Sequence, residues 1–157
     1  MIGFGFDVHQ LSKGEKLVLG GVEIDSELGT IAHSDGDVLL HAVMDAMLGA
    51  IGMGDIGEHF PDTDPKYKDF SSLKMLEVVV ELLRGNYKLI NIDIAIVLEA
   101  PKIKKYKEEM CEKISNVCKI SPNRVNIKAT TNEKMGFIGR GEGIAVYAVC
   151  EIQSLYD

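Results

Sequence analysis

A short polar constellation near the amino terminus constrains this chain more than any other feature of its sequence. Asp7 and His9 stand two residues apart in a run that predicts a strand, so both side chains point to the same face. His41 lies in a segment whose apolar spacing predicts a helix. If these elements converge, the three side chains form a ligand set with one open tetrahedral position, which is typical of catalytic zinc. The alternative is a hydrogen-bonded core histidine beside a chance Asp-x-His pair.

Length and composition indicate one globular domain. We expect a single catalytic domain over residues 1–157, because a chain of 157 residues can bury a proper core. Hydrophobic residues make up 46% of the chain and charged residues 26%, which argues against disorder. The net charge of −7 argues against nucleic acid as a partner, since no basic field would displace phosphate counterions. A phosphorylated small molecule remains compatible, because local donors and metal ions can hold it.

The chain also lacks the sequence signals of membrane proteins and exported proteins. No apolar run is long enough to cross a bilayer, so no membrane partner is expected. The apolar start has no basic leader, which argues against a signal peptide. Cys111, Cys118 and Cys150 form no CxxC pair, and we expect thiols without a chemical role. The expected location is the cytoplasm, or the plastid stroma if the source bears plastids.

The apolar pattern predicts an α+β fold with a single mixed β-sheet and helices packed on one face. Strands are expected at residues 2–9, 16–19, 22–24, 89–98, 125–129 and 144–152, and helices at 37–51, 73–84 and 105–119. Asp35 or Asp37 can cap the first helix, and Ser71 and Ser72 the second. Residues 53–69 are expected to form a long polar loop, and such loops are usually functional or mobile.

The strands carry apolar residues on both faces. The run at residues 94–98 is apolar at every position, for example. A single layer of helices covers only one face of a sheet, so the other face would remain bare. Because a bare apolar face favours association, we expect an oligomer that buries this face.

A second polar segment has the composition of a phosphate and metal site. Residues 130–134 combine two hydroxyls with a carboxylate and precede a glycine-rich stretch at residues 136–143. Hydroxyls and amides donate to phosphate oxygens, Glu133 can hold a hard divalent cation, and Arg140 can bind an anion through two hydrogen bonds. The alternative is a glycine-rich turn with solvated charges.

Several motifs occur in a fixed order along the chain, from residue 3 to about residue 149. They are residues 5–9 (GFDVH), 32–41 (AHSDGDVLLH), 54–57 (GDIG), 60–65 (FPDTDP), 100–102 (APK), 128–131 (KATT) and 136–143 (GFIGRGEG). Together they resemble the family of 2-C-methyl-D-erythritol 2,4-cyclodiphosphate synthases, and the combination is specific although no single motif is.

The resemblance implies a cyclising phosphorus–oxygen lyase of the non-mevalonate isoprenoid pathway. The family converts 4-diphosphocytidyl-2-C-methyl-D-erythritol 2-phosphate into 2-C-methyl-D-erythritol 2,4-cyclodiphosphate and releases CMP. The 2-phosphate oxygen of the substrate attacks the β-phosphorus. Because both reacting groups belong to one molecule, catalysis is mainly positioning and charge neutralisation.

The resemblance also implies roles for individual residues. Asp7, His9 and His41 would hold one Zn²⁺ per subunit, and Glu133 a second divalent cation, Mg²⁺ or Mn²⁺. His33 and Thr131 match the catalytic positions. The implied substrate-binding residues are Ser34, Asp55, Ile56, Gly57, Phe60, Pro61, Asp62, Thr63, Asp64, Ala100, Pro101, Lys102, Ile103, Lys104, Thr130, Thr131, Asn132, Glu133, Phe137 and Arg140.

The implied assembly is a homotrimer with each active site between adjacent subunits, and the bare sheet face would line the trimer core. Two positions depart from some relatives, which carry Thr at Asn132 and an acid at Tyr147. The second departure leaves open what a central channel binds. Asp45, one helical turn after His41, would either orient that histidine or be a solvated helix residue.

Two other functions compete with this one. The first is a zinc phosphodiesterase that uses a metal-bound hydroxide, for which Asp55 is the evident base. The second is a non-enzymatic trimeric nucleotide-binding module with structural zinc. It would need a fourth protein ligand, and no cysteine lies in the constellation.

Overall fold

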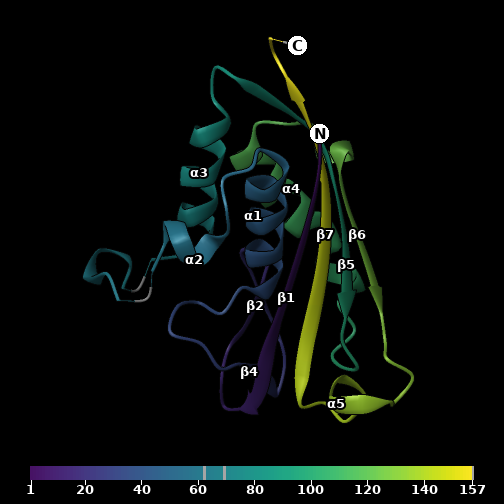
Figure 1. The fold of residues 1–157 in the computed structure, drawn as a ribbon. Helices are drawn as coiled ribbons and strands as arrows, with labels where there is room; N and C mark the ends of the chain where they lie inside the picture. The colour runs from purple at the N-terminus through teal and green to yellow at the C-terminus, as the bar shows by residue number, and fades with distance from the viewer. Residues whose placement is uncertain (62, 69, 157) are drawn as a thin grey trace.

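A mixed five-stranded sheet forms the centre of the computed structural model, which describes residues 1–61, 63–68 and 70–156 (Figure 1). Its strands are β1 (Ile2–Lys13), β4 (Leu28–Thr30), β5 (Tyr87–Val97), β6 (Val125–Thr130) and β7 (Gly143–Ser154). They are arranged in the order β4-β1-β7-β5-β6, and only β5 and β6 are parallel. The α+β fold and the mixed sheet are therefore confirmed. The prediction of a single sheet is wrong, because β2 (Leu17–Leu19) and β3 (Val22–Ile24) form a separate hairpin.

Three main helices lie on one side of the sheet (Figure 1). They are α1 (Val38–Ala50), α3 (Ser72–Leu83) and α4 (Lys107–Cys118), and each lies within two residues of its predicted bounds. The expected loop at residues 53–69 instead contains the short helix α2 (Ile56–His59) and the 3₁₀ turn η1 (Pro65–Tyr67). Further short elements are α5 (Gly136–Gly139), η2 (Lys104–Tyr106) and η3 (Pro122–Arg124). Among the described residues, no helix is long and apolar enough to span a bilayer.

Two glycines in β1 allow α1 to lie directly on this strand. A Cβ atom at Gly3 would overlap the carbonyl oxygen of Ala46, and one at Gly5 would overlap that of Ala42. Any other residue would therefore push the helix off the strand. Asp7 and His9 follow on the same face of β1 by the period of two, so the close contact leads directly to the predicted ligands.

The amino-terminal end of α1 is fixed by Asp37. Its buried carboxylate accepts hydrogen bonds from the backbone N–H groups of Leu40 (3.0 Å), Gly20 (3.0 Å) and Gly21 (2.7 Å). Asp37 is thus the helix cap, and it also holds the β2–β3 turn against α1. Burial raises the pKa of Asp37 to about 6, against the effect of the three donors.

The opposite face of the sheet exposes a row of apolar side chains. On β1, Ile2 is 67% exposed, Phe4 62% and Phe6 44%. On β7, Tyr147 is 42% exposed, and its ring centroid lies 5.0 Å from that of Phe6. The bare apolar face that the strand pattern predicts is therefore present in the single chain. We call it the open face.

Candidate metal centre and substrate site

Asp7, His9 and His41 converge where β1 meets α1. Asp7 Oδ2 lies 3.1 Å from His41 Nδ1 and 3.2 Å from His9 Nδ1. One potential ligand atom from each residue lies within 4.8 Å of the other two. All three side chains are partly buried. The structure therefore brings together the three residues that the sequence pattern selected, and they form a candidate metal site, which we call the triad.

The chemistry of the triad fits a divalent cation. Buried His9 Nδ1 has no hydrogen-bond partner among the residues that the structure describes, which leaves a nitrogen available for a ligand. Burial raises the pKa of Asp7, but the hydrogen bond of His41 and the charges of both imidazoles outweigh it and lower the pKa to about 2. A charged carboxylate beside two imidazoles is a ligand set that suits Zn²⁺.

The second ring nitrogen of His41 also has a partner. His41 Nε2 lies 3.2 Å from the hydroxyl of Ser72, and that hydroxyl lies 2.5 Å from Asp35 Oδ1. Of the two serines predicted to cap the second helix, only Ser71 does so, accepting from the N–H of Lys74 at 3.3 Å. The contact of Ser72 with His41 was not predicted from the sequence. The one signal for it was the presence of two adjacent serines where a single helix cap is enough.

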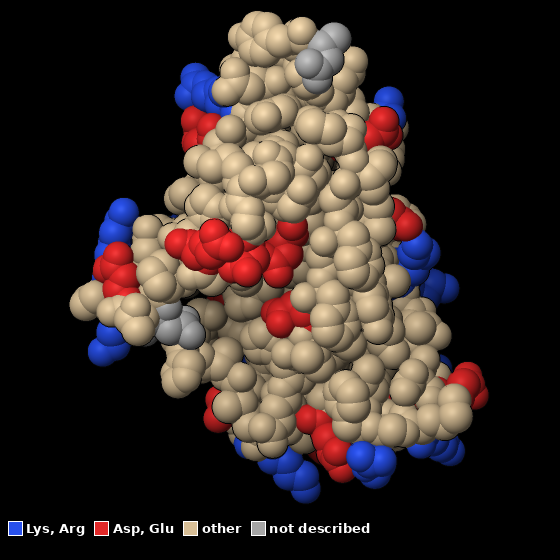
Figure 2. Space-filling model, in the orientation of Figure 1, with Lys and Arg blue, Asp and Glu red and all other residues tan. Residues whose placement is uncertain are grey.

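Asp45 does not orient His41, and it is not a solvated helix residue either. Its carboxylate accepts from the N–H of Ile56 at 2.9 Å and so holds the start of α2 beside α1. Burial raises the pKa of Asp45, and the charges of Asp55 and Asp7 add to the rise. In Figure 2 acidic surface gathers near α1 and α2, in the middle of the face on view, while Lys and Arg lie mostly at the margins.

The first group of predicted substrate residues lies in segments connected to α1. His33 is exposed and Ser34 half-buried, in the connection between β4 and α1. Asp55 caps α2 through the N–H of Glu58 at 3.1 Å. The other members of this group differ in exposure. Phe60 is only 6% exposed and therefore packs in the core. Ile56, Gly57, Pro61, Thr63 and Asp64 are at least partly exposed, and Asp62 lies outside the described residues.

The second group lies where β5 and β6 end. Val97 of β5 pairs with Thr130 of the parallel strand β6, so the segments that follow the two strands leave the sheet side by side at the same end. Thr131 and Glu133 are exposed, and Glu133 adopts a left-handed backbone with φ of 52°. On the neighbouring segment Ala100, Pro101, Lys102 and Lys104 are at least partly exposed. Ile103 is only 3% exposed, so its side chain belongs to the core.

Glu99 connects these two segments, and the sequence pattern did not select it. Its Oε1 atom accepts from the N–H of Asn132 at 2.8 Å and from that of Lys134 at 3.2 Å. Both donors flank Glu133, so the carboxylate of Glu99 holds the turn that presents this residue. A non-local contact of this kind leaves no periodic signal in the sequence.

A single chain does not place the second group beside the triad. Thr130 of β6 lies level with Val8 of β1, one residue before His9, with β7 and β5 between them. Because neighbouring strands are about 4.8 Å apart, the separation is about 14 Å. The two halves of the predicted site are thus separate within one chain.

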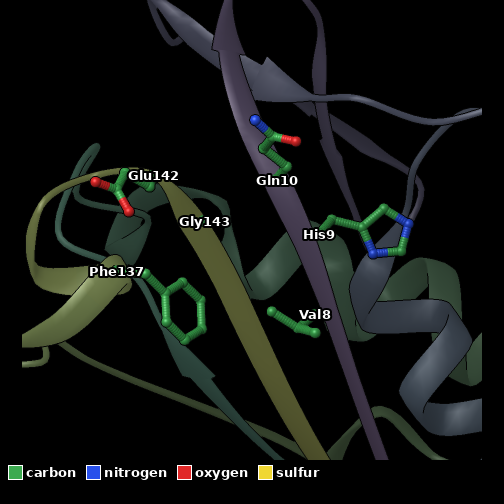
Figure 3. A pocket seen from close by; sticks show the side chains of 6 residues that line it. All are labelled: Val8, His9, Gln10, Phe137, Glu142 and Gly143. Carbon is green, nitrogen blue, oxygen red and sulfur yellow. The ribbon is translucent and has the colours of Figure 1, made fainter.

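A hollow of about 380 Å³ lies near the start of β7, lined by Val8, His9, Gln10, Phe137, Glu142 and Gly143. Figure 3 shows Val8 and Phe137 on one side of β1, while the ring of His9 turns to the side of α1. The hollow therefore borders the triad at His9, while Val8 and Phe137 line it on the other side of β1. Arg140 is already paired beside it, because its guanidinium donates to the Glu142 carboxylate at 2.8 and 3.2 Å.

Comparisons with known proteins agree with this geometry. The model of the YgbB family matches residues 1–153. The 2-C-methyl-D-erythritol 2,4-cyclodiphosphate synthase of Symbiobacterium thermophilum is 58% identical over 97% of this chain and 98% of its own. A solved structure of a synthase with the same name, in a CDP-bound form, has a TM-score of 0.90 at 34% identity, over 98% of this chain and 100% of that one. The bifunctional IspDF of Campylobacter jejuni has a TM-score of 0.93 at 45% identity, over 99% of this chain and 42% of that longer chain.

The chain therefore belongs to the YgbB family. Curated relatives that it matches at 52%, 58% and 55% identity are named 2-C-methyl-D-erythritol 2,4-cyclodiphosphate synthase, so the family predicted from the motifs is confirmed. Enzyme function is confirmed with it, at the level of this family.

Proposed function

We propose that this chain converts 4-diphosphocytidyl-2-C-methyl-D-erythritol 2-phosphate into 2-C-methyl-D-erythritol 2,4-cyclodiphosphate and CMP. We assign the activity to a single catalytic domain, residues 1–157, acting in the cytoplasm. The observation that carries the proposal is the converged triad of Asp7, His9 and His41, in a chain whose curated relatives bear the name of this enzyme.

The proposed metal sites are the triad for Zn²⁺ and Glu133 for Mg²⁺ or Mn²⁺. The unpartnered Nδ1 of His9 supports the first, and the exposed carboxylate of Glu133 supports the second. When bound, the two cations would offset the negative charge of the substrate diphosphate.

The residues of the chain would act mainly by holding one substrate conformation. In the reaction a 2-phosphate oxygen forms a bond to the β-phosphorus, and the bond from that phosphorus to the bridging oxygen breaks, so CMP leaves with that oxygen. His33, Ser34 and Thr131 would donate hydrogen bonds to phosphate oxygens. Asp55 and Gly57 would bind the methylerythritol hydroxyls. Holding both phosphates in contact can account for much of the barrier reduction, because the attack is intramolecular.

We further propose a homotrimer in which each site combines two subunits. The apolar open face supports the assembly, because it leaves large aromatic side chains in water. The separation of about 14 Å between His9 and Thr130 supports a shared site, since the triad and Glu133 would then come from neighbouring chains. Residues 100–104 and 130–134 would hold the cytidine diphosphate part.

The test is phosphorus NMR of the product formed from the diphosphocytidyl substrate in ¹⁸O-labelled water. The expected result is CMP and a cyclic diphosphate, with no ¹⁸O in either product. A phosphodiesterase would introduce solvent oxygen at phosphorus, and a non-enzymatic nucleotide-binding module would leave the substrate intact. The variant His41→Ala is the inactive control.

A further inference from the structure

His41 is held through both of its ring nitrogens. Nδ1 faces the triad, 3.1 Å from Asp7 Oδ2, and Nε2 faces Ser72 Oγ at 3.2 Å. A cation in the triad would take the lone pair of Nδ1, so the neutral ring must carry its only proton on Nε2. With the cation bound, the atom next to Nε2 therefore determines how well this Nε2–H tautomer is stabilised.

The hydroxyl of Ser72 can accept a hydrogen bond from Nε2–H and donate its own hydrogen to Asp35. The side chain of Ser72 is fully buried, and its hydroxyl lies 2.5 Å from Asp35 Oδ1. Asp35 also accepts from the backbone N–H of Ser72 at 2.8 Å, through Oδ2. The donor directions are consistent, because Nε2–H donates to the hydroxyl and the hydroxyl donates to the carboxylate. Each polar atom of Ser72 on this path has a partner.

We infer that Ser72 and Asp35 are positioning residues of the metal centre, which hold His41 in the Nε2–H tautomer and fix the orientation of its ring. The inference rests on the triad being the metal site proposed above. A ligating histidine commonly donates its second N–H to an oxygen, and removing that partner typically weakens metal binding about 10- to 100-fold.

The pair also connects the metal centre to segments that would hold the substrate. Ser72 is the first residue of α3 and directly follows the segment that contains Phe60. Asp35 follows His33 and Ser34 in the chain. The hydrogen bonds of the Asp35 carboxylate to Ser72 therefore connect the segment after β4 to the start of α3, directly beside His41.

The neighbouring serine supplies a matched control for the test. Ser71→Ala and Ser72→Ala each remove one hydroxyl from the same end of α3, but Ser71 contacts the N–H of Lys74 and not His41. Zn²⁺ affinity of the metal-free proteins is measured by competition with a chromophoric chelator. We expect Ser72→Ala to bind Zn²⁺ about 10- to 100-fold more weakly than the wild type, and Ser71→Ala to bind with almost unchanged affinity.

Ring-nitrogen NMR gives a readout that a purely structural role of Ser72 would not change. In the Zn²⁺-loaded wild type, where the cation engages Nδ1, the Nε2–H proton of His41 is expected to exchange slowly with water, because it donates to buried Ser72. In Ser72→Ala at saturating Zn²⁺ this proton is expected to exchange with water much faster, with the helix content unchanged. Ser72→Thr keeps the hydroxyl and should restore the slow exchange, while Asp35→Asn should weaken Zn²⁺ binding in the same direction as Ser72→Ala.

The outcomes separate this inference from the proposed function. If the wild type and His41→Ala bind Zn²⁺ equally well, the proposed metal site is wrong and the inference falls with it. If the wild type binds Zn²⁺ and His41→Ala does not, the metal site stands. Wild-type affinity and an unchanged Nε2–H exchange rate in Ser72→Ala would then overturn the role of Ser72 alone.

Discussion

At the scale of single residues, protonation of His41 sets the pH range in which the triad can hold a metal. Burial lowers the pKa of His41, but the hydrogen bond and charge of Asp7 outweigh it and raise the pKa above the ordinary 6.5. A raised pKa means that the metal-free ring keeps its proton to higher pH. Zn²⁺ must displace this proton, so its apparent affinity should fall at least about tenfold per pH unit below that pKa.

Zinc competition from about pH 5 to pH 8 measures this dependence. Asp7, with its pKa lowered to about 2, stays charged throughout and adds no slope of its own. An affinity that stays constant from pH 7 down to pH 5, within about threefold, would contradict the participation of His41.

Glu133 tests the second cation separately from the first. The change Glu133→Gln keeps the shape of the side chain but removes its charge, so the diphosphate would lose charge compensation as CMP departs. We expect turnover to fall at least about 100-fold, while Zn²⁺ content and folding stay normal. Glu108→Gln, at an exposed position in the first turn of α4, is the control. Near-normal activity of Glu133→Gln in magnesium buffer would mean that the cation is held elsewhere.

How much of the site could be predicted depended on how local each signal was. The period of two placed Asp7 and His9 on one face, and the helical pattern placed His41 on α1. Ser72 and Glu99 were missed, because their contacts join segments more than 30 residues apart. Such pairs arise from tertiary packing, which a single sequence does not display.

At the scale of elements, the contact between β1 and α1 is what brings the triad together. Gly5→Ala would place a Cβ atom onto the carbonyl oxygen of Ala42 and force α1 away from β1. We expect this change to lower the free energy of unfolding by about 3 kcal/mol and to weaken Zn²⁺ binding. Gly49→Ala, in α1 with no heavy atom within 4 Å of the added carbon, should instead raise it by about 0.5–1 kcal/mol. Urea unfolding and zinc competition compare the two variants.

Most of the elements that the sequence predicted are long enough to show a period, and the three-residue strands β2 and β3 are the exceptions. The three main helices and the long strands were found, while β4, α2 and α5, of three or four residues each, were not. β1 also continues past its predicted end to Lys13, because Leu11, Ser12 and Lys13 pair with β4. Strand β4 is too short to show an apolar pattern in the sequence, so the part of β1 that pairs with it could not be predicted.

At the scale of the whole molecule, the open face is the feature that a single chain leaves unexplained. The sequence predicted this face because the strands carry apolar residues at both odd and even positions. The exposed aromatic rings of β1 and β7 form it. Phe4→Glu would place a charge in the proposed trimer core, so we expect a shift from trimer to monomer at micromolar concentration. Val78→Glu, at a 43% exposed position on α3, should leave the trimer intact. Sedimentation analysis distinguishes these states, and a monomeric wild type would contradict the assembly.

A shared active site makes a further prediction, which sedimentation alone cannot test. In one chain the triad lies on β1 and α1 and the turn of Glu133 follows β6, so strands β7 and β5 separate them across the sheet. If each site takes its triad from one subunit and Glu133 from the next, two inactive variants can restore each other. The variants His41→Ala and Glu133→Gln are unfolded together and reassembled in equal amounts. An intact site then forms wherever a Glu133→Gln subunit supplies the triad and its His41→Ala neighbour supplies Glu133. Random assembly gives about one quarter of wild-type activity. Each variant reassembled alone is the control, and a mixture as inactive as either variant would mean that both metal sites belong to the same chain.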